Sequence, residues 1–224
     1  MRVIRASQIA LFAAYFGVIV ALTLATGWLL ARAIPPSDFR GVAVVALTFV
    51  AFYLWGFVVY RTFLAISPLQ EGDLAPGSRA ETIAQVDTLF YLLMFYSLTR
   101  THFLPVPLLR LVYQALGARL GPNTYGGVIL DPPLTTIGRN CIVGHDAVLF
   151  SHAIEGTHFA LARITIGDDV TIGAHAVVMS GVSIGDGAIV SAGAVVGKGT
   201  RIEAGEIWGG IPARRIRAAP GPAP

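Results

Sequence analysis

The chain has 224 residues, of which 54% are hydrophobic and only 13% are charged. This composition excludes an ordinary soluble domain along the whole length, and we expect part of the chain to lie in lipid. The formal net charge of +3, without runs of like charge, excludes a nucleic-acid-binding surface. Cys141 is the single cysteine, which excludes an intramolecular disulfide and a cysteine-ligated zinc site, and we expect it to be a small buried thiol.

Residues 1–67 predict a two-helix transmembrane anchor. From Gln8 to Ile34 the chain is apolar and uncharged until Arg32, and a second apolar run from Gly41 to Ile66 is interrupted only by Arg61. Each run exceeds the roughly 20 helical residues that cross a hydrocarbon core. A cleaved signal peptide is the alternative for the first run, but that run is too long and a second span follows at once.

The arginines near the ends of these runs predict the orientation. The outer ends carry four of them and the turn between the runs carries two: Arg2, Arg5, Arg61 and Arg79 against Arg32 and Arg40. Because basic residues favour the inner side, we expect both termini and the C-terminal domain in the cytoplasm, with the anchor in a bacterial inner membrane.

Residues 68–120 are expected to connect the anchor to the C-terminal domain. Pro68 to Arg79 is a polar linker, and the apolar stretch from Thr88 to Thr99 is too short to span, so we expect it to be interfacial or re-entrant. Pro107 to Leu120 has the pattern of an amphipathic helix, with Arg110 and Gln114 opposite its apolar face. Such a helix can lie on a membrane surface or cap the following domain, and both alternatives stay open. The apolar face consists of Leu108, Leu109, Val112, Leu116 and Leu120.

A period of six residues dominates the C-terminal half. The aliphatic members are Ile166, Ile172, Val178, Ile184, Val190, Val196 and Ile202. An earlier stretch from Ile137 through Val143 to Leu149 keeps the spacing, and the register breaks between Leu149 and Ile166. One hexad cannot bury its aliphatic residue alone, whereas stacked coils align these residues into an apolar interior with parallel strand pairing. We therefore predict a coil of short strands and turns.

This pattern resembles the left-handed parallel β-helix of hexapeptide-repeat acyltransferases. The likeness covers residues 121–217 and rests on the hexads, the interrupting loop Phe150–Gly156 and the closing segment Trp208–Arg214. Residues 218–224 are expected to form a disordered Pro/Ala-rich tail. The paired apolar helices, the amphipathic helix ending in Leu116–Gly121 and the coil together also resemble the membrane modules of polylysine-synthetase-like proteins.

The resemblance implies an enzyme that moves an acetyl group from acetyl-CoA to a hydroxyl or amine, in sites between the subunits of a homotrimer. It implies that His152 is the catalytic base, with Glu155 as the carboxylate beside it, and His158 in the same loop is the competing base. His175, at a turn position of a regular hexad, is assigned no catalytic role. The implied acetyl-CoA contacts are Ala174, Ala192, Gly193, Lys198, Trp208, Gly209, Pro212 and Arg214. No metal is expected.

The sequence also suggests a class of acceptor and leaves two alternative functions open. Membrane attachment suggests an acceptor at the bilayer, such as a lipid-linked glycan or an exopolysaccharide precursor, with its biosynthetic proteins as further partners. One alternative is a trimeric membrane scaffold without enzymatic activity. The other is a γ-class carbonic anhydrase, which would hold zinc through three histidines such as His145, His152 and His158.

Overall fold

The computed structural model describes residues 3–101 and 104–218. They divide into two compact units. The helical unit comprises Val3–Leu69 and Thr82–Met94, and the coil unit comprises Gln70–Glu81 and the chain from Phe95 onward. The expected tail of residues 218–224 lies outside the described residues apart from Ala218.

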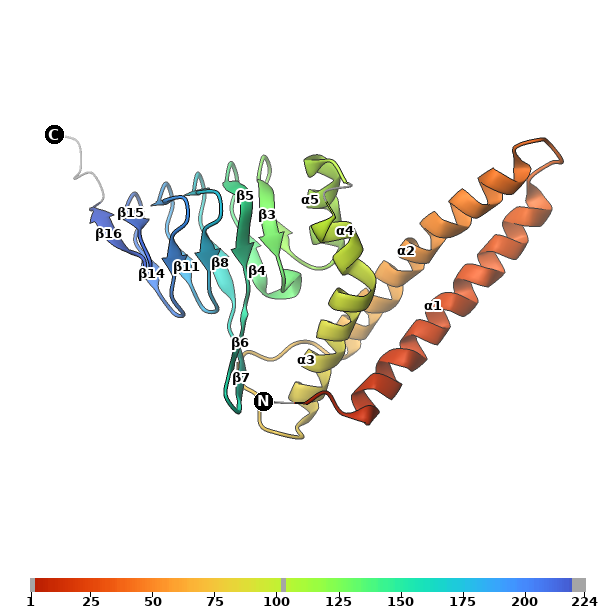
Figure 1. The fold of residues 1–224 in the computed structure, drawn as a ribbon, viewed down its shortest axis with the longest axis horizontal. Coiled ribbons are helices and arrows are strands. Elements are labelled where there is room, and N and C mark those ends of the chain that lie inside the picture. The colour runs from red at the N-terminus through yellow and green to blue at the C-terminus, as the bar shows by residue number, and fades with distance from the viewer. Residues whose placement is uncertain (1–2, 102–103, 219–224) are drawn as a thin grey trace. The chain divides into compact units, whose positions relative to one another are not determined.

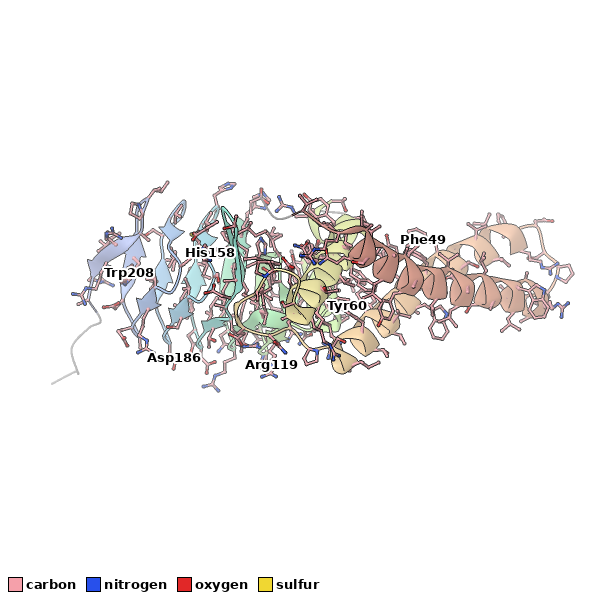
Figure 2. The ribbon with its side chains drawn as sticks, turned by 90° about the horizontal axis from the view of Figure 1, so that it is seen from below. Phe49, Tyr60, Arg119, His158, Asp186 and Trp208 are labelled. Atoms are coloured by element: carbon pink, nitrogen blue, oxygen red, sulfur yellow. The ribbon has the colours of Figure 1, made fainter. Side chains whose placement is uncertain are left out.

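Two long apolar helices make up most of the helical unit. Helix α1 spans Ala6–Ala33 and helix α2 spans Arg40–Ile66, and both are long and apolar enough to cross a membrane. They contact one another through a hydrogen bond from Trp55 Nε1 to Thr26 Oγ1, 3.0 Å long. Many of their large apolar side chains face outward, such as Phe49 on α2, which is 63% exposed (Figure 2). An outward apolar surface on both helices is what a lipid environment favours.

Helix α3 (Arg79–Phe90) supplies the aromatic centre of this unit. Phe90 is fully buried, and its ring lies within 6.0 Å of the rings of Phe12, Tyr15, Tyr60 and Phe63. The Tyr60 hydroxyl lies 2.7 Å from a carboxylate oxygen of Asp87, which is the hydrogen bond a buried phenol requires. After α3 the chain continues through a π-helical turn, Tyr91–Phe95, into α4, Tyr96–Arg100. The stretch from Thr88 to Thr99 is therefore helical, and its contact with a membrane stays a prediction.

The coil unit is built from short parallel strands in three faces (Figure 1). The first face contains β2 (Arg119–Leu120), β4 (Thr135–Ile137), β8 (Ile164–Ile166), β11 (Ser183–Ile184) and β14 (Arg201–Ile202). The second contains the first residues of β3 (Tyr125–Ile129) and of β5 (Ile142–Leu149), then β9 (Thr171–Ile172), β12 (Ile189–Val190) and β15 (Ile207–Gly209), with β16 (Arg214–Arg217) antiparallel at its end. The third contains the last residues of β3 and β5, then β10 (Val177–Val178) and β13 (Val195–Val196).

The predicted hexad register is confirmed by the strand pairing. Each strand of the regular coil pairs with the strand three hexads further along, as Val178 does with Val196 and Ile184 with Ile202. All seven aliphatic hexad residues are at most 3% exposed, and with Ile137, Val143 and Leu149 they line the interior. Cys141 joins this core at 1% exposure, and burial raises the pKa of its thiol.

The outward side chains differ between the faces. The first face carries a mostly polar row: Arg119, Thr136, Thr165, Ser183 and Arg201. The second face carries Tyr125, Ile142, Thr171, Ile189 and Ile207, and the third carries Val128, Val148, Val177 and Val195. Two neighbouring faces of the coil are therefore apolar on the outside as well as the inside.

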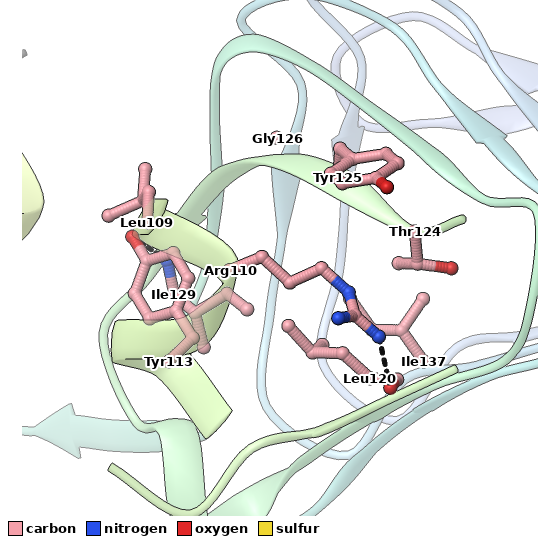
Figure 3. Close-up of a pocket in the computed structure, with 9 residues that line it drawn as sticks. All are labelled: Leu109, Arg110, Tyr113, Leu120, Thr124, Tyr125, Gly126, Ile129 and Ile137. Atoms are coloured by element: carbon pink, nitrogen blue, oxygen red, sulfur yellow. Dashed lines mark hydrogen bonds between the residues drawn. The ribbon is translucent and has the colours of Figure 1, made fainter. Parts of the chain in front are cut away.

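Helix α5 (Val106–Ala115) closes the open end of the coil. Tyr113 is 1% exposed in the coil's core, where the backbone N–H of Ile129 donates to its hydroxyl, and burial raises the pKa of Tyr113 to about 12. Arg110 donates from Nη2 to the carbonyl oxygen of Leu120 (Figure 3) and to that of Gly121. The capping alternative is therefore confirmed for α5, and contact of the same helix with a membrane stays a prediction.

Two details of the predicted amphipathic helix were wrong. The helix does not extend to Leu120, because Gly117 adopts a left-handed backbone conformation (φ 109°) and Arg119–Leu120 pair with β4 as a strand. Arg110 does not face away from the domain, because the carbonyls at the open end of the coil need donors and its guanidinium supplies them.

Candidate active site

The break in the hexad register is a β-hairpin that leaves the coil (Figure 1). Strand β6 spans His152–Glu155 and pairs antiparallel with β7, His158–Leu161. A third short strand, β1 (Gly72–Asp73), adds to the outer edge of β7. His152 is the first residue of the hairpin, at the point where the chain leaves the third face of the coil.

The side chain of Asp131 contacts both the backbone and the side chain of His152. The Nδ1 atom of His152 lies 2.8 Å and 3.0 Å from the two carboxylate oxygens of Asp131. Oxygen Oδ2 also accepts hydrogen bonds from the backbone N–H groups of Ser151, at 2.6 Å, and His152, at 3.2 Å. The carboxylate is 12% exposed and the imidazole 35% exposed, so the acid is sheltered whereas part of the imidazole is open to solvent.

The coil register brings Asp131 to this place. Strands β3 and β5 pair in parallel with Ile129 opposite Leu149, so the residues two positions further on, Asp131 and Ser151, also lie side by side. The carbonyl of Asp131 accepts from Thr135 Oγ1 at 3.0 Å, which fixes the turn that follows. The pairing shifts register between Gly126 and Val128, so the offset is 17 residues at Tyr125↔Ile142 and 20 residues at Ile129↔Leu149, and neither equals three hexads. That shift is why the hexad pattern alone did not single out Asp131.

The contact sets the chemistry of the imidazole. A carboxylate can only accept hydrogen bonds, so in the neutral imidazole Nδ1 of His152 carries the hydrogen and Nε2 the lone pair. The ring of Phe150, with its centroid 5.6 Å from that of His152, packs beside it. This arrangement can take a proton at Nε2 while Asp131 stabilises the resulting imidazolium.

Glu155 does not occupy the position expected for it beside His152. It lies at the other end of β6, where its Oε2 accepts a hydrogen bond from Lys198 Nζ at 2.6 Å. Successive residues of a strand point to opposite faces, and Glu155 is three positions after His152 along β6. Asp131, rather than Glu155, is the carboxylate in contact with His152, and Glu155 instead ties the hairpin to the coil.

His145, His158 and His175 lie away from this contact. His158 is exposed and pairs in register with Glu155, next to the hairpin turn. His175 has a left-handed backbone (φ 57°), as expected for a turn, and its ring centroid lies 6.0 Å from that of His145 at the corner between the second and third faces. Within residues 3–101 and 104–218 of one chain, His, Cys, Asp and Glu form no group of three or more that could hold a metal ion.

The implied acetyl-CoA contacts fall on two different corners of one chain. Ala174, Ala192 and Gly193 stack at the corner between the second and third faces, where the Gly193 N–H donates to the Ala174 carbonyl at 2.8 Å. Gly209 and Pro212 lie on and after β15, at the last level of that corner. Lys198 lies instead at the corner after the third face, the corner from which the His152 hairpin departs. One chain therefore does not bring the two groups together.

The closing segment is organised around Glu206, which the sequence reasoning missed. Its side chain is 6% exposed and accepts hydrogen bonds from Trp208 Nε1 at 2.8 Å and Arg215 Nη1 at 2.9 Å. These two contacts, with Arg215 the larger cause, lower the pKa of Glu206. Trp208 lies on the last coil (Figure 2), and Arg214 is exposed on β16 opposite Gly209. Glu206 therefore holds Trp208, one of the expected coenzyme contacts, together with Arg215.

The comparisons agree with this architecture. Residues 163–205 match the family model described as "Bacterial transferase hexapeptide (six repeats)". This segment runs from the end of the hairpin to the last coils. A protein of Bacillus subtilis (strain 168), YvoF, provisionally named an acetyltransferase, is 38% identical over 54 residues, which are 24% of this chain and 31% of that protein. The matched segment thus spans about a third of the length of that curated relative.

Comparison with solved structures finds a similar fold in one protein with coenzyme bound. A hexapeptide-repeat acetyltransferase from Vibrio cholerae O1 biovar eltor, in complex with acetyl coenzyme A, aligns with 71% of this chain and 99% of its own length, at a TM-score of 0.52 and 21% identity. A galactoside acetyltransferase in complex with coenzyme A covers 58% of this chain and 80% of its own, at a TM-score of 0.42 and 22% identity.

Proposed function

We propose that this chain is an acetyl-CoA-dependent acetyltransferase in which His152, oriented by Asp131, is the general base. The observation that carries the proposal is the 2.8 Å contact between His152 Nδ1 and Asp131 at the root of the register-breaking hairpin. The hexapeptide-repeat domain and the acetyltransferases among its relatives support the reaction class.

The reaction is a direct transfer without a covalent enzyme intermediate. The acceptor hydroxyl or amine attacks the thioester carbonyl of acetyl-CoA while His152 Nε2 takes its proton. Asp131 stabilises the imidazolium, and backbone N–H groups stabilise the oxyanion of the tetrahedral intermediate. Collapse of that intermediate breaks the carbon–sulfur bond, and the imidazolium returns the proton to the departing thiolate of coenzyme A.

The active site is completed by a neighbouring subunit of a homotrimer whose coils are left-handed. The two groups of expected contacts support this proposal, since they lie on different corners of one chain and a second subunit could present the missing corner to the His152 hairpin. The outward apolar rows also support it, because the exposed apolar side chains of the second face and the partly exposed valines of the third favour burial against another copy.

Acetyl-CoA lies along the corner of Ala174, Ala192 and Gly193. Small side chains there leave the backbone accessible. A Cβ added at Gly193 would meet nothing within 4 Å, and the φ of 69° at Gly193 favours glycine. At the end of that corner, Trp208, Gly209 and Pro212 border the coenzyme, and the exposed guanidinium of Arg214 is available to a phosphate. Lys198 contributes from the other corner, next to the hairpin it binds through Glu155.

Helices α1 and α2 anchor the enzyme in the bacterial inner membrane, with both termini and the coil in the cytoplasm. Their length, composition and outward apolar side chains support the two spans. The acceptor is membrane-associated, such as a lipid-linked sugar or an exopolysaccharide precursor.

Two measurements test the proposal. Calorimetric titration with acetyl-CoA should give saturable binding by the purified protein. Mass spectrometry of lipid-linked glycans from cells with and without the gene should then reveal an acetyl group that depends on the protein. Absence of acetyl-CoA binding would instead favour the non-enzymatic scaffold, and stoichiometric zinc with CO₂ hydration would favour the carbonic anhydrase.

A further inference from the structure

We propose that Arg163 is a positioning residue for the candidate base, and that Glu71, in the stretch expected to be a polar linker, holds Arg163 in place. Arg163 binds the turn that carries Asp131, and Asp131 orients His152. The inference rests on the proposed function, because it takes His152 as the base of the acetyl transfer.

The turn after Asp131 has few backbone donors of its own. It is a short 3₁₀ helix, Pro132–Leu134, and its first two residues are prolines, which have no N–H. Within the turn, the Leu134 N–H donates to the Asp131 carbonyl at 3.1 Å, and the N–H of Thr135 donates to the Pro132 carbonyl. The carbonyl oxygens that follow need donors from other parts of the chain.

Two side chains supply those donors. Ser151 Oγ donates to the Leu134 carbonyl at 3.2 Å, and Arg163 Nη1 donates to the Pro133 carbonyl at 3.3 Å. Ser151 is fully buried, whereas the side chain of Arg163 is 33% exposed. Arg163 therefore holds the turn from the solvent side, where its guanidinium can be replaced without opening a cavity in the core.

Arg163 lies at the point where the hairpin rejoins the coil. The residue after it, Ile164, pairs with the first residue of β4, which places Arg163 beside the end of the turn. The residue before it, Ala162, donates its N–H to the Ser151 carbonyl at 2.9 Å and closes the root of the hairpin. Because His152 directly follows Ser151, the base and Arg163 belong to the same hairpin root.

Glu71 fixes the side chain of Arg163. Its two carboxylate oxygens accept hydrogen bonds from the Arg163 backbone N–H, at 2.9 Å, and from Nε, at 3.1 Å. Strand β1 brings Glu71 to this place, since Gly72 pairs with Leu161 at the outer edge of β7, and Glu71 is part of the coil unit. Exposed ion pairs contribute little stability, but this contact restricts a long, flexible side chain whose Nη1 reaches Pro133. The contact therefore matters for geometry more than for stability.

Arg163→Met is the principal variant, because it keeps an apolar stem and removes the guanidinium. The Asp131 carboxylate keeps its hydrogen bonds from the Ser151 and His152 backbone N–H groups, so we expect it to be displaced slightly and not lost. A misplacement of about 1 Å can cost about 10²-fold in rate, and a smaller one should lower kcat by about fivefold to tenfold. The KM for acetyl-CoA should change less than twofold, since the coenzyme is proposed to lie along another corner.

Activity is measured with the full chain in detergent, as transfer of radiolabelled acetyl from acetyl-CoA to a total lipid extract of the bacterial host. Arg139→Met is the matched control: it removes another exposed ion pair, with Asp168 at 3.0 Å, at the corner between the first and second faces, and should keep kcat within twofold. Arg163→Lys keeps the charge, but one nitrogen replaces the two, Nε and Nη1, that reach different partners. Its kcat should remain at least twofold below that of the parent.

The pH dependence separates positioning from a direct effect of charge. A weaker Asp131 contact destabilises the imidazolium, so the acid limb of the kcat/KM profile should move to lower pH in Arg163→Met. Loss of a nearby positive charge by itself would move that limb to higher pH. Deuterium exchange at the imidazole C2 position of His152, followed by peptide mass spectrometry over a range of pH, reports the same titration without substrate.

Two further variants test the path of the effect. In an Asp131→Asn background, Arg163→Met should change kcat by less than twofold, because Arg163 acts through that carboxylate. Glu71→Gln should lower kcat by about threefold with little change in melting temperature, and adding it to Arg163→Met should have no further effect. Glu71→Gln also serves as the test if Arg163→Met does not fold, since the Glu71 side chain is 46% exposed.

The inference would be overturned by kcat within twofold of the parent in both Arg163→Met and Glu71→Gln, or by full recovery of kcat in Arg163→Lys. Movement of the His152 titration to higher pH in Arg163→Met would also overturn it. If the parent itself transfers no acetyl group, the proposed function fails, and the deuterium exchange still tests the positioning. Movement to lower pH in Arg163→Met and not in Arg139→Met would then support it, and no movement in either would overturn it.

Discussion

Replacement of Asp131 by asparagine tests the contact on which the mechanism depends. Asparagine keeps the size of the side chain and an oxygen that can accept from the Ser151 and His152 backbone N–H groups, which are 2.6 Å and 3.2 Å from Oδ2. The change removes the negative charge that faces Nδ1. It can also present an amide N–H to the ring, which would place the imidazole hydrogen on Nε2, the wrong nitrogen for a base.

The expected loss follows from the geometry. Opposite unit charges about 4 Å apart interact by about 4 kcal/mol at an effective dielectric constant of 20, which suits a site whose two partners are 12% and 35% exposed. Each 1.4 kcal/mol corresponds to about tenfold in rate, so the imidazolium loses a stabilisation worth about 10³-fold, and partial exposure lowers this toward about 10²-fold. We expect kcat to fall by about 10²- to 10³-fold.

The assay follows release of the coenzyme A thiol under steady-state conditions, with acetyl-CoA and acceptor varied in turn. Because Asp131 acts on the base and not on the coenzyme, the KM for acetyl-CoA should change less than threefold. Glu155→Gln is the matched control, since it removes the carboxylate that was expected beside His152, and it should retain at least a third of the activity. If Asp131→Asn melted like the parent and kept near-normal kcat while Glu155→Gln lost activity, the assignment of the orienting carboxylate would be refuted.

The remaining predictions concern the base, the assembly, the anchor and the closing segment. His152→Ala should lower turnover by about 10²- to 10⁴-fold with acetyl-CoA affinity retained, whereas His175→Ala should be nearly silent; loss of turnover in His158→Ala alone would identify the other base. Multi-angle light scattering should give a trimer, and a monomer at working concentration would contradict the shared site. The full chain should require detergent, and removal of residues 1–66 should release a soluble or peripherally bound protein; full-length protein in the aqueous phase would contradict the anchor. Because the folded-state pKa of Glu206 is lowered, its stabilisation is complete above the ordinary carboxyl pKa of 4.5 and is lost as pH falls through the lowered value. Thermal melting of Glu206→Gln should therefore lack part of the acid-induced decrease seen in the parent.

The local pattern of the sequence was sufficient for the elements that repeat. An aliphatic residue every sixth position buries itself only if coils stack, so Ile172, Val178 and Ile184 were placed in the interior before the structure was known. The two apolar runs predicted α1 and α2 to within two residues at each end, because a long uncharged stretch leaves few alternatives. The break in register after Leu149 likewise marked the hairpin that bears His152.

Contacts between distant segments were decided only by the tertiary structure. Asp131 meets His152 because a register shift in the first coils changes which residues stack, and no local pattern encodes that shift. Arg110 looked like a solvent-facing residue of an amphipathic helix, yet the unpaired carbonyls at the end of the coil draw its guanidinium inward. Glu71 and Arg163 are 92 residues apart in the sequence. They meet because the two-residue strand β1 pairs with the hairpin, and that pairing depends on where the chain leaves the coil. Periodicity determines the repeating scaffold, whereas the hydrogen bonds that close its ends and orient its site depend on the three-dimensional register.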